Sequence, residues 1–233
     1  MQSVPIREEG QHMKNRLHIL TVVLILTIVT IACQFGSDIA RDPTPESESM
    51  EILFQDDFSD NSGNWYTFVD DTGITDYENE GFRININESS AYHWTNPDFE
   101  FTDTRIEVEA TKLSGPEEND FGIICRYHDE NNFYFFTISS DGYYGIAKIV
   151  DGVESLVGME ELGFDESAIY AGDSTNLVGA DCIGTELKLY VNEKKLAEVS
   201  DSDFNSGDIG LIASTYEEPG TDILFDNLIV RSP

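Results

Sequence analysis

The chain has 233 residues, with 45 Asp and Glu against 13 Lys and Arg, and its formal net charge is −32 at pH 7. Nucleic acids are bound by Lys and Arg, so this charge excludes nucleic acid as a partner. The 40% of hydrophobic and 11% of aromatic residues are enough for a packed core and argue against a disordered chain. The length fits one folded domain with a tail.

The first part of the chain predicts an export signal over 1–32. A short basic stretch over 13–16 precedes an uncharged apolar run over 19–32. This run is shorter than the about twenty residues that a helix needs to cross the hydrocarbon core, so it is typical of a secretory signal peptide. Acidic residues ahead of the basic stretch are unusual in a signal, which makes Met13 a second candidate for the true start.

The signal ends in a sequence that resembles the bacterial lipobox. Thr30-Ile31-Ala32-Cys33 places a small residue directly before a cysteine, although Thr30 stands where Leu is usual. The resemblance implies that Cys33 is lipidated when the signal is cleaved, and the alternative is a plain signal cut nearby. The following stretch, within 33–51, is rich in Ser, Pro and acidic residues, so we expect a flexible acidic tether.

The remaining residues, 52–233, predict an all-β domain. Residues 105–113 alternate between apolar and charged, whereas 121–127 and 133–139 are apolar on both faces, as central strands of packed sheets are. Turn signals such as Asp-Gly separate these runs. Further short strands are expected at 187–191, 195–199, 209–214 and 223–230. The spacing favours a two-sheet antiparallel jelly-roll β-sandwich.

Four segments resemble the concanavalin A-like lectin/glucanase superfamily, closest to the laminin-G-like and family-16-glycosidase-like domains of bacterial lipoproteins. These segments are 56–65, 121–146, 187–214 and 223–230. One departure is Glu193, where the family usually has Gly after the turn Asn. The resemblance implies the sandwich fold over 52–233 and leaves the activity open, because one scaffold hosts many functions.

A catalytic site is not expected. The glucanases of this superfamily carry Glu-x-Asp-x-Glu on one strand, with the acids on one face. The nearest match is 105–109, where Glu107 and Glu109 share a face but Arg105 stands in place of the first acid. Alternating charge on an exposed strand explains these residues without catalysis. A glycosidase or lyase acting on modified sugars remains the enzymatic alternative.

Two cysteines remain for the domain if Cys33 carries lipid. Cys125 and Cys182 would then form a disulfide in an exported protein, and the alternative is two buried thiols. Cys182 lies on the apolar side of its predicted strand, so a disulfide requires Cys125 to point inward as well. Arg126 would then point outward.

The outward side would carry the candidate ligand-binding residues. Aromatic rings suit the apolar face of a sugar, and charged groups suit its hydroxyls. If a simple hairpin follows Arg126, the expected ligand-binding residues are Arg126, Tyr134, Phe136, Lys188 and Tyr190, with Trp94 on an exposed rim. The alternative is that the aromatic residues over 133–136 are ordinary core.

Acidic loops make calcium a candidate ligand. The resemblance places the first strand beside the last, so Asp57 and Asp226 are expected to share a structural calcium ion, although no segment has the spacing of an EF-hand.

Taken together, the sequence predicts an exported lipoprotein, anchored to the bacterial cell membrane or outer membrane with its domain facing outward. The domain is expected to bind carbohydrate or a surface glycan without catalysis. A protein-interaction or structural domain without a small ligand is the second alternative.

Overall fold

Apolar side chains at every second position decide the architecture, because they turn one face of each strand toward a common core. The computed structural model describes residues 50–233, which form one compact unit. The signal peptide expected over 1–32, Cys33 and nearly all of the tether lie outside the described residues. Within 50–233, no helix is long and apolar enough to cross a membrane.

Sheet A, the larger sheet, has nine strands. They are β1 (Ile52–Asp56), β2 (Phe68–Asp70), β3 (Gly73–Glu78), β4 (Gly81–Ile86), β6 (Thr104–Ser114), β12 (Thr175–Ile183), β13 (Glu186–Val191), β14 (Lys194–Ser200) and β16 (Thr221–Arg231). Their order is β14-β13-β12-β6-β16-β4-β3-β2, and β1 pairs with the second half of β16.

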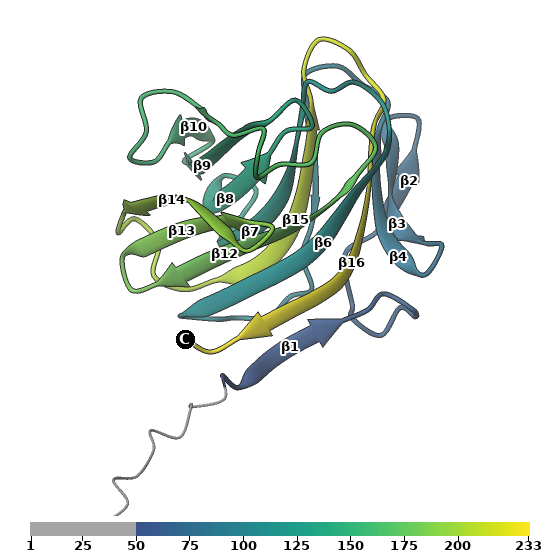
Figure 1. The fold of residues 1–233 in the computed structure, drawn as a ribbon. Helices are drawn as coiled ribbons and strands as arrows, with labels where there is room; N and C mark the ends of the chain where they lie inside the picture. The colour runs from purple at the N-terminus through teal and green to yellow at the C-terminus, as the bar shows by residue number, and fades with distance from the viewer. Residues whose placement is uncertain (1–49) are drawn as a thin grey trace, which may run out of the picture. The chain divides into compact units, whose positions relative to one another are not determined.

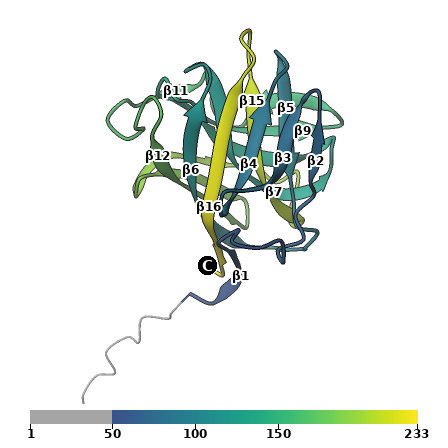
Figure 2. The same ribbon diagram turned by 90° about the vertical axis from the view of Figure 1, so that its right-hand side faces the viewer.

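Sheet B, the second sheet, has seven strands. They are β5 (Ala91–Thr95), β7 (Asn119–Asp129), β8 (Asn132–Ile138), β9 (Tyr143–Val150), β10 (Val153–Leu156), β11 (Gly163–Phe164) and β15 (Asp208–Thr215). Their order is β10-β9-β8-β7-β15-β5, and β11 pairs with β9. The two antiparallel sheets lie face to face (Figure 1), and Figure 2 shows β6, β16 and β4 side by side in sheet A. The predicted all-β sandwich is confirmed.

The core fills the space between the sheets. In β6 the predicted alternation is confirmed, since Ile106, Val108 and Ala110 are buried between half-exposed polar neighbours. The neighbouring strands of sheet A contribute apolar side chains in the same way, and sheet B covers them with residues such as Phe121 and Ile123 of β7. Two facing layers of alternating strands therefore enclose one continuous core.

A disulfide joins the two sheets. Cys125 in β7 of sheet B is bonded to Cys182 in β12 of sheet A, with Cα atoms 6.8 Å apart. Both side chains are buried in the core, as the side of the strand that carries Cys182 predicts. The bond closes a loop between residues 57 positions apart, which restricts the unfolded chain.

Replacing both cysteines by alanine is expected to lower the free energy of unfolding by about 2–5 kcal/mol, because the unfolded chain gains freedom and the core loses two buried sulfur atoms. Urea unfolding followed by tryptophan fluorescence measures the change. The control is the unsubstituted protein in reductant, which should approach the stability of the variant. Equal stability of the oxidised, reduced and substituted forms would contradict the predicted contribution.

Candidate functional site

The register between β7 and β8 decides which aromatic side chains are available for binding. Cys125 pairs with Tyr134, whereas Asp129 pairs with Asn132, so the register changes within β7. Arg126 lies at this irregularity with a left-handed φ of 53°. Against β8 this shift is two positions, which keeps the faces of β8 unchanged. Against β15, where Gly210 pairs with Ile124 and Asp208 with Tyr127, the shift is one position, and it moves Tyr127 to the same face as Ile124.

The expectation that Tyr134 and Phe136 face outward is therefore wrong. Both are fully buried in the core between the sheets. The Tyr134 hydroxyl donates to Asp201 and accepts the backbone N–H of Phe204 at 3.1 Å. A simple hairpin would place Tyr134 beside Arg126, whereas Tyr134 pairs with Cys125, and paired residues point to the same face.

The expectation that Arg126 points outward is also wrong, because its side chain is buried and does not reach an outer face. Its guanidinium donates to the backbone oxygen of Phe204 at 2.9 Å and to that of Thr102 at 3.4 Å, and it lies 3.4 Å from a carboxylate oxygen of Asp103. These contacts tie the bulge to two loops. The side chain of Arg126 therefore has a structural role.

Lys188 and Tyr190 lie on the outer face of sheet A, so they do not join Trp94, which lies on sheet B. The Lys188 ammonium is 2.8 Å from Glu186, and the Tyr190 hydroxyl donates to Asp181 at 3.2 Å. Both side chains are half-buried in a network of charged neighbours on β12 and β13.

The bulge leaves a second apolar cluster on the outer face of sheet B. Its buried members are Ile124, Phe133, Phe135, Ala147 and Ile212. Half-buried side chains cover them, namely Tyr92, Trp94, Tyr127, Ile149 and Leu156. We call these ten residues the outer-face cluster. An apolar layer of this kind on the solvent side of a sheet indicates a binding surface, because solvent-facing strands otherwise carry polar side chains.

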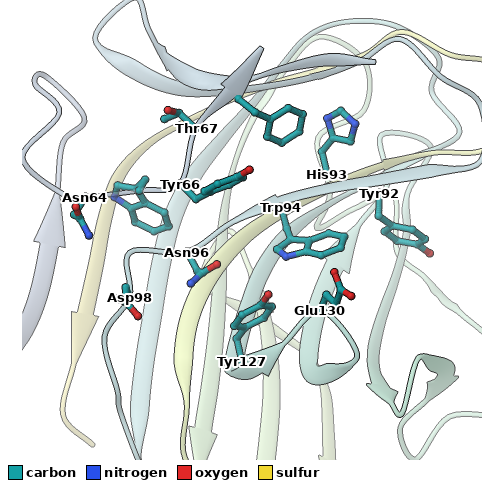
Figure 3. A pocket seen from close by; sticks show the side chains of 12 residues that line it. Asn64, Tyr66, Thr67, Tyr92, His93, Trp94, Asn96, Asp98, Tyr127 and Glu130 are labelled. Carbon is teal, nitrogen blue, oxygen red and sulfur yellow. The ribbon is translucent and has the colours of Figure 1, made fainter. Parts of the chain in front are cut away.

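A cavity of about 790 Å³ opens at the β5 end of this cluster, and we call it the edge cavity (Figure 3). It is lined by residues 64–68, which precede β2 and extend into it, by Tyr92, His93, Trp94, Asn96 and Asp98 from and after β5, and by Tyr127 and Glu130 at the end of β7. Segments that are distant in sequence therefore meet where β5 forms the edge of sheet B.

Aromatic rings that pack on a buried phenylalanine line one side of the edge cavity. Trp94 lies opposite Ile212 in the pairing of β5 and β15, which places its ring on the outer face. The rings of Trp94 and Tyr127 lie 5.9 and 5.4 Å from the ring of buried Phe133. Tyr66 lies across the cavity with 63% of its surface exposed. Packing on Phe133 fixes the first two rings before any ligand arrives.

A buried carboxylate holds the polar loop of the edge cavity. Asp208 accepts a hydrogen bond from the Asn96 side chain at 2.9 Å and another from the backbone N–H of Asp98 at 2.7 Å. Burial raises the pKa of Asp208, against these hydrogen bonds, which favour the ionised form. The loop therefore presents Asn96 and Asp98 in a fixed position beside the aromatic rings.

His93 contributes a polar atom that the protein leaves without a partner. Its side chain is 7% exposed, and its Nδ1 is among the buried polar atoms of residues 50–233 that make no hydrogen bond. Its ring packs edge-on against Phe68 at 4.9 Å and lines the edge cavity. Burial lowers the pKa of His93, against the opposing charges of Asp70 and Glu88, so the ring is neutral at pH 7. His93 thus places a neutral imidazole in the wall of the edge cavity, with its Nδ1 enclosed by the protein.

Of the expected ligand-binding residues, Trp94 lines the edge cavity, and its role in binding stays a prediction. Tyr92 and Trp94 alternate with His93 along β5, and this spacing shows that the two aromatic rings share a face. The signal that Tyr127 joins them was hidden, because the bulge at Arg126 reverses the face expected from simple alternation.

The acidic residues that the sequence analysis considered for catalysis or for calcium binding do not line the edge cavity. On sheet A, Glu107 is 2.7 Å from Arg231, and Glu109 accepts from Asn227 at 3.3 Å. Asp57 and Asp226 lie close enough that the charge of Asp57 helps burial raise the pKa of Asp226. Within the part of the chain that the structure describes, no group of three or more Asp, Glu, His or Cys is placed to hold a metal ion. The calcium site stays a prediction.

Replacing Tyr134 by phenylalanine is expected to lower the free energy of unfolding by about 1–3 kcal/mol, because Asp201 and the Phe204 N–H lose a buried partner. Tyr143→Phe is the matched control, since Tyr143 is exposed and should change stability little. Thermal and urea unfolding of both variants measure the difference. A Tyr134→Phe variant as stable as the control would contradict the buried placement.

No protein-family model matches the chain, and no curated protein matches it. Solved structures do match. The carbohydrate-binding module CBM66 from Bacillus subtilis is 17% identical with a TM-score of 0.57, over 72% of this chain and 96% of that one. A Bacillus subtilis protein of unknown function with a galectin-like fold is 12% identical with a TM-score of 0.60, over 78% and 96%.

The match to the GH43 protein BlXynB from Bacillus licheniformis is 12% identical with a TM-score of 0.56 and covers 77% of this chain but 39% of that longer protein. At these identities the likeness concerns the fold alone. The chain therefore shares an antiparallel β-sandwich fold with these structures.

Proposed function

We propose that the domain binds carbohydrate at the edge cavity, without catalysis. The observation that carries this proposal is the position of Trp94 and Tyr127, whose rings rest on buried Phe133 at the wall of the cavity. A sugar ring has apolar C–H faces that stack on aromatic planes, and its hydroxyls need hydrogen-bonding groups around the edge.

The polar groups of the edge cavity suit the hydroxyls of such a ligand. The loop of Asn96 and Asp98 supplies an amide and a carboxylate beside the rings, and the imidazole of His93 lies in the same wall. The volume of about 790 Å³ lies within the about 300–1,000 Å³ of small-molecule sites. The match to a structure titled a carbohydrate-binding module supports the same ligand class.

The proposal includes export and anchoring. The basic stretch, the apolar run over 19–32 and the lipobox-like sequence before Cys33 support a lipid-anchored protein of the bacterial cell envelope whose domain faces outward. Lipidation of Cys33 would leave Cys125 and Cys182 for their disulfide, in agreement with an oxidising compartment.

Trp94→Ala is expected to weaken glycan binding at least about tenfold, because it removes a supported ring from the cavity wall. The ligand is the strongest hit of a glycan array, and calorimetry of the purified protein measures its affinity. Tyr66→Ala is a second variant that should also weaken binding, and its exposed side chain carries little of the stability. Tyr170→Ala, on an equally exposed tyrosine outside the cavity, is the control and should bind normally. A folded protein that binds no glycan of the array would contradict the proposal.

The anchor has a separate test in a bacterial host. A palmitate analogue fed to the cells should label the protein, and Cys33→Ala should lose the label and leave the membrane fraction. Equal labelling of the variant, or recovery of unlabelled protein cut at another position, would contradict lipidation at Cys33.

A further inference from the structure

A second cavity lies on sheet B near the start of β7, whereas the edge cavity reaches the end of β7. Its volume is about 370 Å³. It is lined by Glu118, Asp120, Ser139, Asp141, Tyr143, Leu162 and Tyr216. We call it the acidic cavity, because three of these side chains are carboxylates. The edge cavity and the acidic cavity share no lining residue.

Asp120 is the buried carboxyl of the acidic cavity. Its side chain is 8% exposed and accepts a hydrogen bond from the Tyr216 hydroxyl. Burial, together with the charges of Glu154 and Asp141, raises the pKa of Asp120 to about 7, and the hydrogen bond from Tyr216 only partly opposes this shift. The net effect of these surroundings is to favour the neutral carboxyl over the charged one.

The basic side chains of the domain leave these acids without a positive partner. Every Lys and Arg of residues 50–233 forms an ion pair, and none of these pairs involves Glu118, Asp120 or Asp141. Asp141 accepts from the Ser139 hydroxyl, which is neutral. The charge of the acidic cavity is thus uncompensated within the described part of the chain.

A buried hydroxyl beside Asp120 also lacks a partner. Ser214 lies directly opposite Asp120 in the pairing of β15 with β7, and opposite Tyr92 on the other side. It faces outward, since Ile212 two residues before it belongs to the outer-face cluster. The side chain of Ser214 is 1% exposed, and its Oγ makes no hydrogen bond within residues 50–233. Buried polar atoms are normally paired, and this unpaired hydroxyl lies beside Asp120 on the same face of sheet B, behind the residues that line the acidic cavity.

We propose that the acidic cavity binds a small organic ammonium group. Carboxylates with no protein cation supply the charge, and the rings of Tyr143 and Tyr216 supply the aromatic surface on which alkylated ammonium groups rest. Leu162 adds an apolar contact for methyl or methylene groups. This site is separate from the proposed carbohydrate site, and neither depends on the other.

Ionisation of Asp120 links binding to pH. A cation favours the ionised carboxylate, so the ligand lowers the pKa of Asp120 and binds more tightly as pH rises through about 7. Below this pH the proton competes with the ligand. Between pH 6 and pH 8 the affinity for the cation is expected to rise about tenfold.

Choline tests the site, because its quaternary ammonium keeps its charge at every pH. Calorimetry of the purified protein between pH 5.5 and 8.5 compares choline with its neutral isostere 3,3-dimethylbutan-1-ol. We expect choline to bind at least about tenfold more tightly than the isostere at pH 8, and about tenfold more tightly at pH 8 than at pH 6.

Asp120→Asn should weaken choline binding at least about tenfold and remove its pH dependence. Tyr143→Ala is a second variant at an exposed side chain and should also weaken binding, whereas Glu166→Gln, an exposed acid outside the cavity, should not. Trp94→Ala should leave choline binding unchanged, which separates this site from the carbohydrate site. Circular dichroism confirms that each variant is folded.

The ammonium group can be carried by a glycan or by a lipid. Displacement of choline by a glucosamine tetramer would support an amino-sugar source, and displacement by phosphatidylcholine vesicles would support a lipid source. Equal affinity for choline and its isostere, or full choline affinity in folded Asp120→Asn, would overturn the proposal.

Discussion

The left-handed backbone at Arg126 is the constraint on which the rest of sheet B depends. A residue other than glycine pays about 1 kcal/mol or more for a positive φ, so the surrounding structure must hold it there. Hydrogen bonds from the guanidinium to Thr102 and Phe204 do so. Gly207 permits the arrangement, because a Cβ at this position would lie 2.6 Å from the carbonyl carbon of Arg126.

The register of β7 with its two neighbours distributes the aromatic side chains between two faces. Tyr134 pairs with Cys125 and turns inward, whereas Phe133 turns outward and supports Trp94 and Tyr127. The bulge shifts β7 by one position against β15, and this shift brings Tyr127 to the outer face, where it meets Phe133. The candidate binding surface is thus a consequence of backbone geometry as much as of composition.

The acidic composition is divided unevenly between the faces. On the outer face of sheet A, acids such as Glu107 and Glu186 are matched by Arg231 and Lys188. On sheet B, Asp120 has no such partner, and burial raises its pKa. The buried and uncompensated carboxyl of Asp120 supports the proposed ligand site on sheet B.

The alternation of apolar and polar residues along single strands was enough to predict several features of the fold. Alternation located β6, the two cysteines left in an exported domain suggested the disulfide, and the apolar side of β12 gave the direction of Cys182. The faces of β8 were missed because the expected hairpin placed Tyr134 beside Arg126, whereas Tyr134 pairs with Cys125. The proximity of Tyr127 to Trp94 was missed because it depends on the bulge at Arg126 and on the order of β5, β15 and β7 in sheet B.

The central claim is that ligands bind to the outer face of sheet B, and nuclear magnetic resonance of the ¹⁵N-labelled protein tests it most directly. Titration with the glycan of highest affinity should shift the indole N–H of Trp94 and the backbone signals of Tyr127 and Asn96, and should leave those of Lys188 and Tyr190 on sheet A in place. Shifts confined to Lys188, Tyr190 and their neighbours on β12 and β13 would contradict the account.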